Sequence, residues 1–342
     1  MRNPLRRDLI ATALLGVASL SVAGCSGSDA TAQAGGDETA VITIAEPLHS
    51  IGYLPLYAAI ESGAFADVGL TVEVTTLTGG GHVNAVLSGE VFGFIGGVES
   101  GAVANIRGAS LIGVANVVNR GNVYFTAPAG AEPAPGEDLG SYFSGATIVG
   151  GRHGGTPNAI LRYILTQHGL DPDTDTVLQE LEDSSAVPAA MRAGSADIAV
   201  TSEPQLGLGV SEGLWSEPFL NVPEMLGPYA YSSIVVPEET IETQADLVQR
   251  LVDALMMGQE LIESDPDYAF ELASQEFDTL DPAVIQATLD RAYADSLWDG
   301  SCLSEAAVEV NLEVARVGGI LADEDAPQTY DDVATTQFTG EC

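Results

Sequence analysis

The stretch that decides the fold runs from Val41 to Glu73 and reads VITIAEPLHSIGYLPLYAAIESGAFADVGLTVE. Its β-branched start predicts a short strand, and the apolar spacing of residues 53–65 predicts an amphipathic helix. Gly69 then interrupts the chain, and the alternation over residues 70–74 predicts a second strand. The polar loop between the first strand and the helix occupies the place where open α/β sheets bind ligands. We therefore expect this stretch to form the first wall of a small-molecule cleft.

The alternation of strand and helix signals occurs twice along the chain. The first unit continues through predicted strands at residues 92–95, 111–118 and 123–125. After a proline-rich acidic loop, the second unit has predicted strands at residues 146–149, 177–181 and 197–200, with helices between them. Such alternation is typical of parallel sheets. A last strand within residues 229–236 precedes a long helical tail, which we expect to pack back on the first unit.

The amino terminus has the features of an exported lipoprotein. Residues 1–24 contain three arginines followed by an apolar run of about 14 residues, shorter than the roughly 20 that a spanning helix needs. Small residues then precede Cys25, which resembles the bacterial lipoprotein box. That resemblance implies cleavage before Cys25 and its lipidation, which would anchor the chain to the cell membrane outside the cytoplasm. The alternative is an ordinary signal peptide. Residues 25–40 are small and polar, as in a flexible tether.

The composition excludes several classes of function. The chain has 49 acidic and 11 basic residues, a formal net charge of −38, and every basic residue is Arg. A field this negative argues against nucleic acid as a partner. Without Lys, a lysine-bound pyridoxal phosphate and a Walker-type phosphate site are both impossible. The acidity itself could reflect the habitat of the host as well as the function.

Two further cysteines follow Cys25, namely Cys302 and Cys342. Because the leader predicts an oxidising compartment, we expect them to form a disulfide that fixes the carboxyl-terminal tail. Two free thiols are the alternative. We see no cluster of His, Cys, Asp and Glu with the spacing of a metal site, and we expect no cofactor.

Residues 53–73 resemble the opening of the nitrate/sulfonate/taurine and thiamine-pyrimidine-precursor binding proteins of ABC importers, and the resemblance extends over about residues 41–240. One departure is Phe92, where the family usually has Asp, as at Asp197. The resemblance implies an α/β, two-lobe periplasmic-binding-protein-like fold of type II, in which each lobe is a mostly parallel sheet flanked by helices. Lobe 1 would comprise residues 41–119 and 234–342, and lobe 2 residues 120–233. The chain would cross between them near residues 119–122 and 228–233, and the ligand would bind at this hinge.

The same resemblance implies a solute-binding protein without catalytic residues. Its solute would be small and polar or anionic, of the sulfonate, nitrate, taurine or pyrimidine-precursor class. Its partners would be the permease and ATPase subunits of an ABC importer, with membrane contact only through the lipid anchor, and we expect a monomer. Two alternatives stay open. A pyrimidine-synthase-like enzyme is disfavoured by export and by the absence of Lys, and a signalling lipoprotein could use the same fold.

Residues 150–158 contain the sharpest candidate for the binding site, with the sequence GGRHGGTPN. Thr156 is predicted as a helix N-cap and Pro157 as the first helical residue. Glycines before a helix start favour an anion at the exposed backbone N–H groups. An ordinary capped helix start is the alternative. The residues that we expect to contact the solute are His49, Ser50, Tyr53, Gly80, His82, Gly97, Glu99, Arg120, Arg152, His153, Gly155, Thr156, Glu203, Tyr229 and Tyr231.

Several of these residues have a plausible structural role instead. Glu99 and Glu203 would accept hydrogen bonds from a solute, or else cap their own helices. Arg120 would pair with an anionic solute or with Glu99, and we favour the internal pair. Tyr229 and Tyr231 would stack on a flat ligand or pack at the hinge. His49 would be an ordinary hydrogen-bonded loop histidine, and the neighbouring acids at 182 and 183 are expected on a solvated surface.

Overall fold

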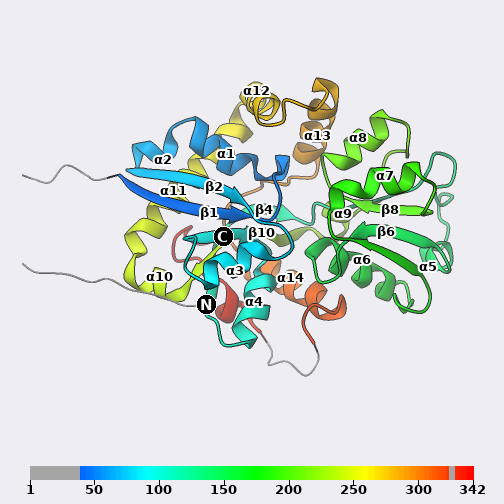
Figure 1. The fold of residues 1–342 in the computed structure, drawn as a ribbon, viewed down its shortest axis with the longest axis horizontal. Coiled ribbons are helices and arrows are strands. Elements are labelled where there is room, and N and C mark those ends of the chain that lie inside the picture. Colours follow the sequence, from blue (N-terminus) through cyan, green and yellow to red (C-terminus); the bar gives the residue numbers. More distant parts are fainter. Residues whose placement is uncertain (1–38, 323–327) are drawn as a thin grey trace, which may run out of the picture. The chain divides into compact units, whose positions relative to one another are not determined.

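The computed structural model describes residues 39–322 and 328–342. The predicted leader, Cys25 and all but the last two residues of the predicted tether lie outside the described residues. Two five-stranded sheets organise the rest (Figure 1). We define lobe 1 as the first sheet with its flanking helices and lobe 2 as the second sheet with its own. In the described part of the chain, no helix is both long and apolar enough to cross a membrane.

The first sheet has the strand order β2-β1-β3-β10-β4. β1 pairs in parallel with β2 and β3, whereas β10 is antiparallel to both β3 and β4. The antiparallel strand β10 therefore follows the lobe 2 segment in the sequence. In the sheet of lobe 1 it lies between β3 and β4. The strands are β1 Ala40–Glu46, β2 Leu70–Thr76, β3 Gly93–Gly96, β4 Leu111–Arg120 and β10 Pro228–Pro237.

The second sheet repeats this arrangement with the order β7-β6-β8-β5-β9. β6 is parallel to β7 and β8, and β5 is antiparallel to β8 and β9. The chain crosses to this sheet between β4 and β5 and returns into β10. The expected α/β fold with two sheets flanked by helices is thus confirmed, and both sheets are mixed, because one strand in each is antiparallel to its neighbours. The strands are β5 Tyr124–Thr126, β6 Thr147–Gly151, β7 Val177–Leu181, β8 Ile198–Thr201 and β9 Leu220–Asn221.

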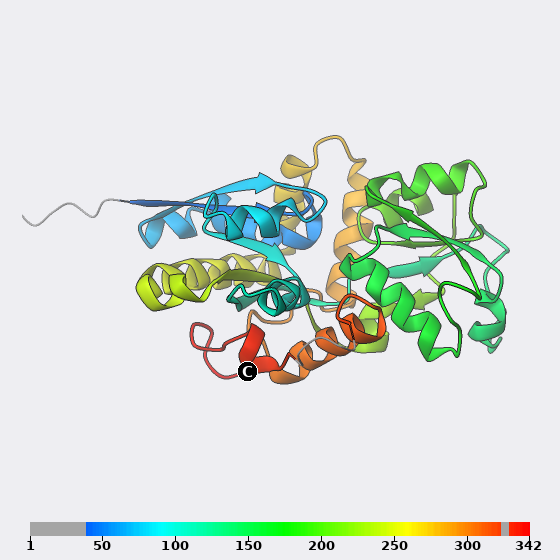
Figure 2. The same ribbon diagram turned by 60° about the horizontal axis from the view of Figure 1, so that its bottom comes forward.

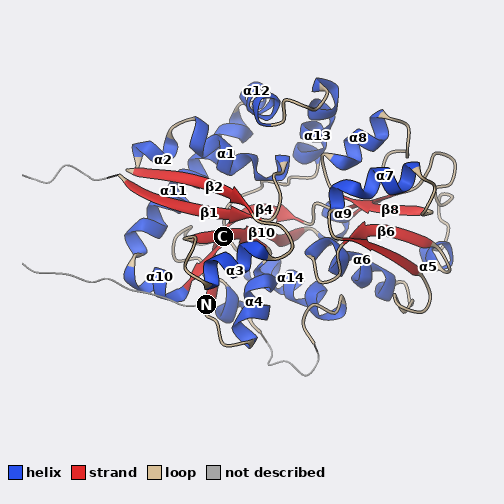
Figure 3. Cartoon of the chain, viewed as in Figure 1, coloured by secondary structure: helices blue, strands red, loops and turns tan. Residues whose placement is uncertain are grey.

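Helices cover both faces of each sheet (Figure 3). In lobe 1, one face packs on α1, α2, α11 and α12 through a core that includes Ile44, Leu56 and Leu251, and the other face packs on α3 and α4. These helices, with α10, are α1 Leu54–Glu61, α2 Ala64–Asp67, α3 Gly81–Leu87, α4 Val98–Ile106, α10 Glu238–Thr243, α11 Ala245–Ser264 and α12 Pro266–Glu276.

Lobe 2 has a smaller core around Phe125, Ile148 and Leu161. Its helices are α5 Leu139–Phe143, α6 Thr156–Gln167, α7 Val187–Arg192, α8 Gln205–Ser211 and α9 Val222–Leu226. Asp197 caps the start of β6 by accepting a hydrogen bond from the Thr147 backbone N–H, 2.8 Å away. Asp197 therefore has a structural role at the start of β6.

The predicted helix over residues 53–65 is in fact two helices. α1 ends at Glu61 and α2 begins at Ala64, because Gly63 between them adopts a left-handed conformation with φ of 84°. A left-handed residue terminates an α-helix, and glycine adopts this conformation without steric cost.

The helical tail packs on lobe 1, as the sequence predicted, and it also contacts lobe 2. Arg291 of α13 (Pro282–Ala294) pairs with Glu203 and Glu217 of lobe 2 at 2.9 and 2.5 Å. The chain then returns to lobe 1, where the Trp298 indole N–H donates to the Gly52 carbonyl over 2.9 Å. In Figure 2 the orange α13 lies beside the green elements of lobe 2.

After α14 (Glu305–Val317) and α15 (Tyr330–Val333), the tail ends at a disulfide between Cys302 and Cys342, whose Cα atoms are 5.5 Å apart.

Candidate functional site

A cleft of about 340 Å³ lies between the two lobes, at the carboxyl ends of β1, β3, β6 and β7. Both lobes and the crossing strand β10 line it. Of the residues predicted to contact a solute, those that line this cleft are Tyr53, Gly80, His82, Gly97, Arg152, Gly155, Thr156 and Tyr231. Those that lie outside its lining are His49, Ser50, Glu99, Arg120, His153, Glu203 and Tyr229.

Arg152 is the cation of the cleft. Its guanidinium reaches from lobe 2 towards lobe 1, where Nη2 lies 3.9 Å from the position of a Cβ on Gly80. Its one recorded hydrogen bond goes from Nη1 to the His153 carbonyl over 3.3 Å, and no carboxylate among the described residues pairs with it. In contrast, carboxylates pair with Arg120, Arg162, Arg192, Arg250, Arg291 and Arg316. An unpaired guanidinium in so acidic a protein is suited to hold an anionic group.

The start of α6 lies beside Arg152. The helix begins at Thr156 with Gly155 as its N-cap, so the predicted cap at Thr156 was wrong by one residue. As a result, the Thr156 side chain does not cap the helix, and its hydroxyl donates to Glu99 Oε1. The N-terminus of this 12-residue helix adds a partial positive charge next to Arg152.

Glu99 is not in contact with the cleft space. Its side chain is buried beneath the lining, where Oε1 accepts from Thr156 and Oε2 accepts from Asn311 Nδ2 over 2.6 Å. Burial raises the pKa of this carboxyl, against the hydrogen bonds from Thr156 and Asn311. Its hydrogen bonds therefore join the walls of the cleft to each other.

His82 lines the cleft from the start of α3 and is buried. Burial lowers its pKa to about 4, and the positive charge of Arg152 acts in the same direction. The ring contacts Phe94 edge to face, with 5.3 Å between centroids, and Nδ1 has no hydrogen-bond partner among the described residues. At neutral pH the imidazole is uncharged, so it offers a solute hydrogen bonding without charge.

Two tyrosines contribute neutral hydroxyls to the cleft. Burial raises the pKa of Tyr53, and it raises the pKa of Tyr231 to about 12. Both phenols therefore remain protonated at neutral pH. With Ser232 of β10 they form a polar but uncharged surface next to the charged wall.

His49 and Ser50 belong to the wall behind the cleft. His49 lines a separate hollow of about 290 Å³, where Nδ1 lies 3.2 Å from Glu46 Oε1 and Nε2 lies 3.5 Å from Glu276 Oε2. Its ring stacks between Tyr57 and Phe277. Ser50 caps the short 3-10 helix Ile51–Tyr53 by accepting from the Gly52 backbone N–H.

The remaining candidates have partners within the protein. Arg120 pairs with Asp299 at 3.0 Å, so its internal partner is not the Glu99 expected from the sequence. His153 Nδ1 lies 3.3 Å from Glu180 on the surface of lobe 2. Buried Glu203 accepts from Gly207, Thr288 and Arg291. Tyr229 packs in the core of lobe 2, with its ring centroid 6.0 Å from that of Tyr231.

The sequence reasoning did not select Ser100, Ser232 and the acids Glu182 and Asp183, all of which line the cleft. The acids were expected on a solvated surface; they are exposed, but at the rim of this cleft. The missing signal was strand order. Gly151 pairs with Leu181, so the residue after each of these parallel strands lies at the same sheet edge.

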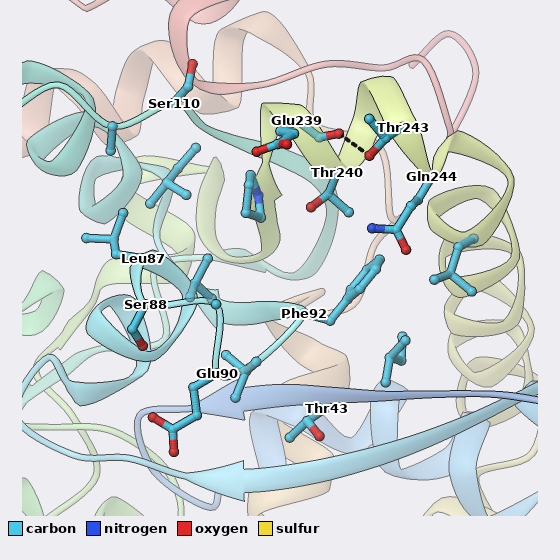
Figure 4. Close-up of a pocket in the computed structure, with 18 of the residues that line it drawn as sticks. Thr43, Leu87, Ser88, Glu90, Phe92, Ser110, Glu239, Thr240, Thr243 and Gln244 are labelled. Atoms are coloured by element: carbon cyan, nitrogen blue, oxygen red, sulfur yellow. Dashed lines mark hydrogen bonds between the residues drawn. The ribbon is translucent and has the colours of Figure 1, made fainter.

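A larger groove of about 970 Å³ lies at the opposite edge of the lobe 1 sheet (Figure 4). Phe92 points across it towards Gln244, and Glu90 points away. Its described lining comes from lobe 1 alone and contains neither Arg nor His. Ligands of open α/β sheets bind at the carboxyl ends of strands, and this groove lies at the amino ends of β1 and β3. We therefore take the smaller cleft as the candidate site. The described residues contain no group of side chains that could hold a metal ion.

The model of the NMT1-like family matches residues 48–275. The Bacillus subtilis (strain 168) protein named "Putative binding protein YtlA" is 27% identical over 255 residues, which cover 73% of this chain and 75% of YtlA.

Solved structures share the fold. The alkanesulfonate-binding protein SsuA from Xanthomonas axonopodis pv. citri, bound to MOPS, superposes with a TM-score of 0.68 at 19% identity, covering 84% of this chain and 96% of SsuA. The periplasmic nitrate-binding protein NrtA from Synechocystis PCC 6803 gives 0.70 at 15% identity, covering 88% of each chain. The chain belongs to the NMT1-like family.

Proposed function

We propose that this chain captures a small solute with an acidic group in the cleft between its lobes and delivers it to an ABC importer. The observation that supports the proposal best is Arg152, which lines the cleft and pairs with no carboxylate of the described residues. A partly exposed guanidinium that lines a cleft without a carboxylate partner is well suited to a ligand that supplies the negative charge. The adjacent start of α6 favours the same sign of charge.

The volume of the cleft bears on the class of solute. Small-molecule pockets range over about 300–1,000 Å³, and 340 Å³ is at the low end of that range. A nitrate ion would leave most of this space to water. A sulfonate, an aminosulfonate or an acidic pyrimidine precursor would also reach the neutral surface formed by Tyr53, Tyr231 and Ser232. We therefore favour an organic acid over a bare inorganic anion.

The sequence also favours a location outside the cytoplasm for this activity. The leader and the small residues before Cys25 favour an extracytoplasmic lipoprotein, with the permease and ATPase of an importer as partners. We expect that Cys25→Ala would release the protein from the membrane fraction into the soluble fraction. Retention of the variant in the membrane fraction would contradict the lipid anchor.

A thermal-shift screen of the purified protein tests the proposed function. Sulfonates, nitrate, bicarbonate and pyrimidines are added separately, and a bound solute raises the melting temperature because it binds only the folded state. A hydrogen bond to a charged group contributes about 1.5–3 kcal/mol, so Arg152→Gln should weaken binding about ten- to hundred-fold.

Arg107→Gln provides the matched control. Arg107 is exposed at the end of α4, lies outside the cleft lining and, like Arg152, has no carboxylate partner among the described residues. The Arg107→Gln variant should bind the solute with the same affinity as the wild type. If Arg152→Gln showed the same shift in melting temperature as the wild type for every solute that binds, the proposal that Arg152 holds the acidic group of the solute would be wrong.

A further inference from the structure

Glu99 lies at the second position of α4, and its carboxylate folds back over the start of that helix. A Cβ on Gly97 would collide with both carboxylate oxygens, which occupy the space where a side chain at this position would lie. Gly97 is therefore required for Glu99 to point towards lobe 2. Only 1% of the Glu99 surface is exposed.

The two carboxylate oxygens connect four elements. Oε1 accepts from the Thr156 hydroxyl at the start of α6 in lobe 2. Oε2 accepts from Asn311 Nδ2 of α14 over 2.6 Å, and the same amide donates to the Ala230 carbonyl of β10 over 3.0 Å. One side chain of lobe 1 thus connects the binding turn of lobe 2, the tail helix and the strand that crosses between the lobes.

No cation compensates this buried carboxylate. Among the described residues, none of the recorded ion pairs involves Glu99, and its hydrogen-bond donors are neutral. The titratable groups that face it are Tyr229 and Tyr231 of β10, whose own pKa values burial raises, so both are uncharged at neutral pH. A buried charge held by neutral donors alone is costly. Burial therefore favours the protonated carboxyl, against the hydrogen bonds from Thr156, Asn311 and the Glu99 backbone, which favour the carboxylate.

We propose that Glu99 is a positioning residue: it acts through Thr156 to hold the turn at residues 152–156 against lobe 1, and closure, which buries its carboxyl, takes up a proton there. The inference rests on the proposed function, because this turn contains Arg152. It assigns Glu99 a role in closing the cleft and none in contacting the solute. We call the contact between Glu99 and Thr156 the clasp.

The sign of the pH dependence follows from the burial of Glu99. In the closed form, burial raises the pKa above the ordinary value of 4.5. When the lobes separate, Thr156 leaves and water reaches the carboxyl, which moves the pKa back towards that value. Closure therefore takes up a proton between the two values. The resulting preference for the closed form is complete below the ordinary pKa and is lost as the pH rises through the raised one.

Distance measurements between spin labels on the full chain, without added solute, test this clasp. Leu87→Cys in lobe 1 and Val177→Cys in lobe 2 provide label positions that are 50% and 56% exposed. For the otherwise wild-type protein we expect a larger short-distance population at about pH 5 than at about pH 8. Glu99→Gln is uncharged and keeps an acceptor for Thr156, so its distances should be short at both pH values.

Thr156→Val and Thr156→Ser form the matched pair. The valine variant keeps the shape but removes the donor, so it should shift towards long distances at both pH values. The serine variant keeps the hydroxyl and should restore the wild-type pH dependence. A purely structural role for Glu99 would not produce this rescue together with the loss of pH dependence in Glu99→Gln. Because Thr156 is partly exposed, these variants keep the test valid if a Glu99 variant does not fold.

The proposal is overturned if the wild type shows the same distances at both pH values, or if Thr156→Val matches the wild type. The distance measurements are made without solute. Either result would therefore leave the solute-binding test of Arg152→Gln unaffected. Conversely, solute binding by Arg152→Gln at wild-type affinity would contradict the proposed function and leave the distance measurements intact. The two failures are therefore distinguishable.

Discussion

His49 is a histidine between two carboxylates, directly after the cleft-lining residues Pro47 and Leu48. Its hydrogen bond to Glu46 raises its pKa, the charges of Glu46 and Glu276 add to this effect, and partial burial opposes it. A raised pKa in the folded state stabilises the fold fully below the unfolded pKa of about 6.5, and this contribution is lost as the pH rises through the folded value.

We therefore predict that His49→Gln lowers the free energy of unfolding more at about pH 5.5 than at about pH 8.5. Because His49 is partly exposed, the difference should be on the order of 0.5–1 kcal/mol. Urea unfolding across this pH range measures it. His153→Gln is the control, since the His153 side chain is 63% exposed. Equal pH profiles for the wild type and His49→Gln would contradict the prediction.

At the residue scale, the sequence located the Gly-rich turn at residues 150–158 better than it predicted the hydrogen-bond partners of Glu99 and Glu203. Arg152 and Thr156 follow a strand and start a helix, which local sequence can indicate. Glu99 and Glu203 also follow strand ends, but their hydrogen-bond partners Asn311 and Arg291 lie far away along the chain. No local pattern shows that these carboxylates are already occupied.

The packing of α11 on α1 is a close contact between elements that the sequence did not indicate. A Cβ on Gly258 would lie 2.7 Å from the Ala59 backbone nitrogen and would also collide with the Pro55 carbonyl. Backbone atoms on both sides cannot move aside as a side-chain end can. Gly258 therefore sets the distance between the two helices that cover lobe 1.

Gly258→Ala should destabilise the protein by about 1–3 kcal/mol, because overpacking forces the two helices apart. Chemical denaturation monitored by circular dichroism provides the measurement. Met257→Ala, next to it on α11 and 46% exposed in the wild type, should change stability by less than about 0.5 kcal/mol. If the two variants were equally stable, the proposed tight approach of α1 and α11 would be wrong.

At the element scale, hydrophobic periodicity located the long helices and buried strands well. It did not separate α1 from α2, because Ser62 and Gly63 interrupt a pattern that remains apolar on either side. The break depends on a single left-handed residue, and a glycine is also compatible with a helix. Periodicity alone therefore could not place it.

Over the whole molecule, the disulfide holds the end of the chain on lobe 1. Cys302 and Cys342 are 40 residues apart in sequence. Between them, Ala334 forms a bridge with Gly113 of β4, and Phe338 is buried in the lobe 1 core. The cross-link thus restricts the unfolded chain over a segment whose folded position it secures.

Replacing both cysteines by serine should lower the free energy of unfolding by about 3–4 kcal/mol, as expected for a closed loop of this length. Guanidinium unfolding with and without reductant measures the effect. The wild type should lose stability on reduction, and the double variant should not change. Insensitivity of the wild type to complete reduction would argue against a stabilising cross-link.

The two-lobe architecture was predictable because the strand and helix alternation occurs twice. The insertion of β10 between β3 and β4 was not, since strand order depends on pairing between distant segments. The contact of α13 with lobe 2 depends likewise on one arginine, Arg291, with partners in Glu203 and Glu217. A surplus of exposed acids conceals which carboxylates are specific partners.

Native mass spectrometry of the full chain, purified from its own host, tests the central claim most directly. The account predicts that the wild type and Arg107→Gln retain a bound organic acid, seen as the same added mass, and that Arg152→Gln has lost it. Retention of that mass by Arg152→Gln would contradict the account, and so would a bound species that bears no acidic group.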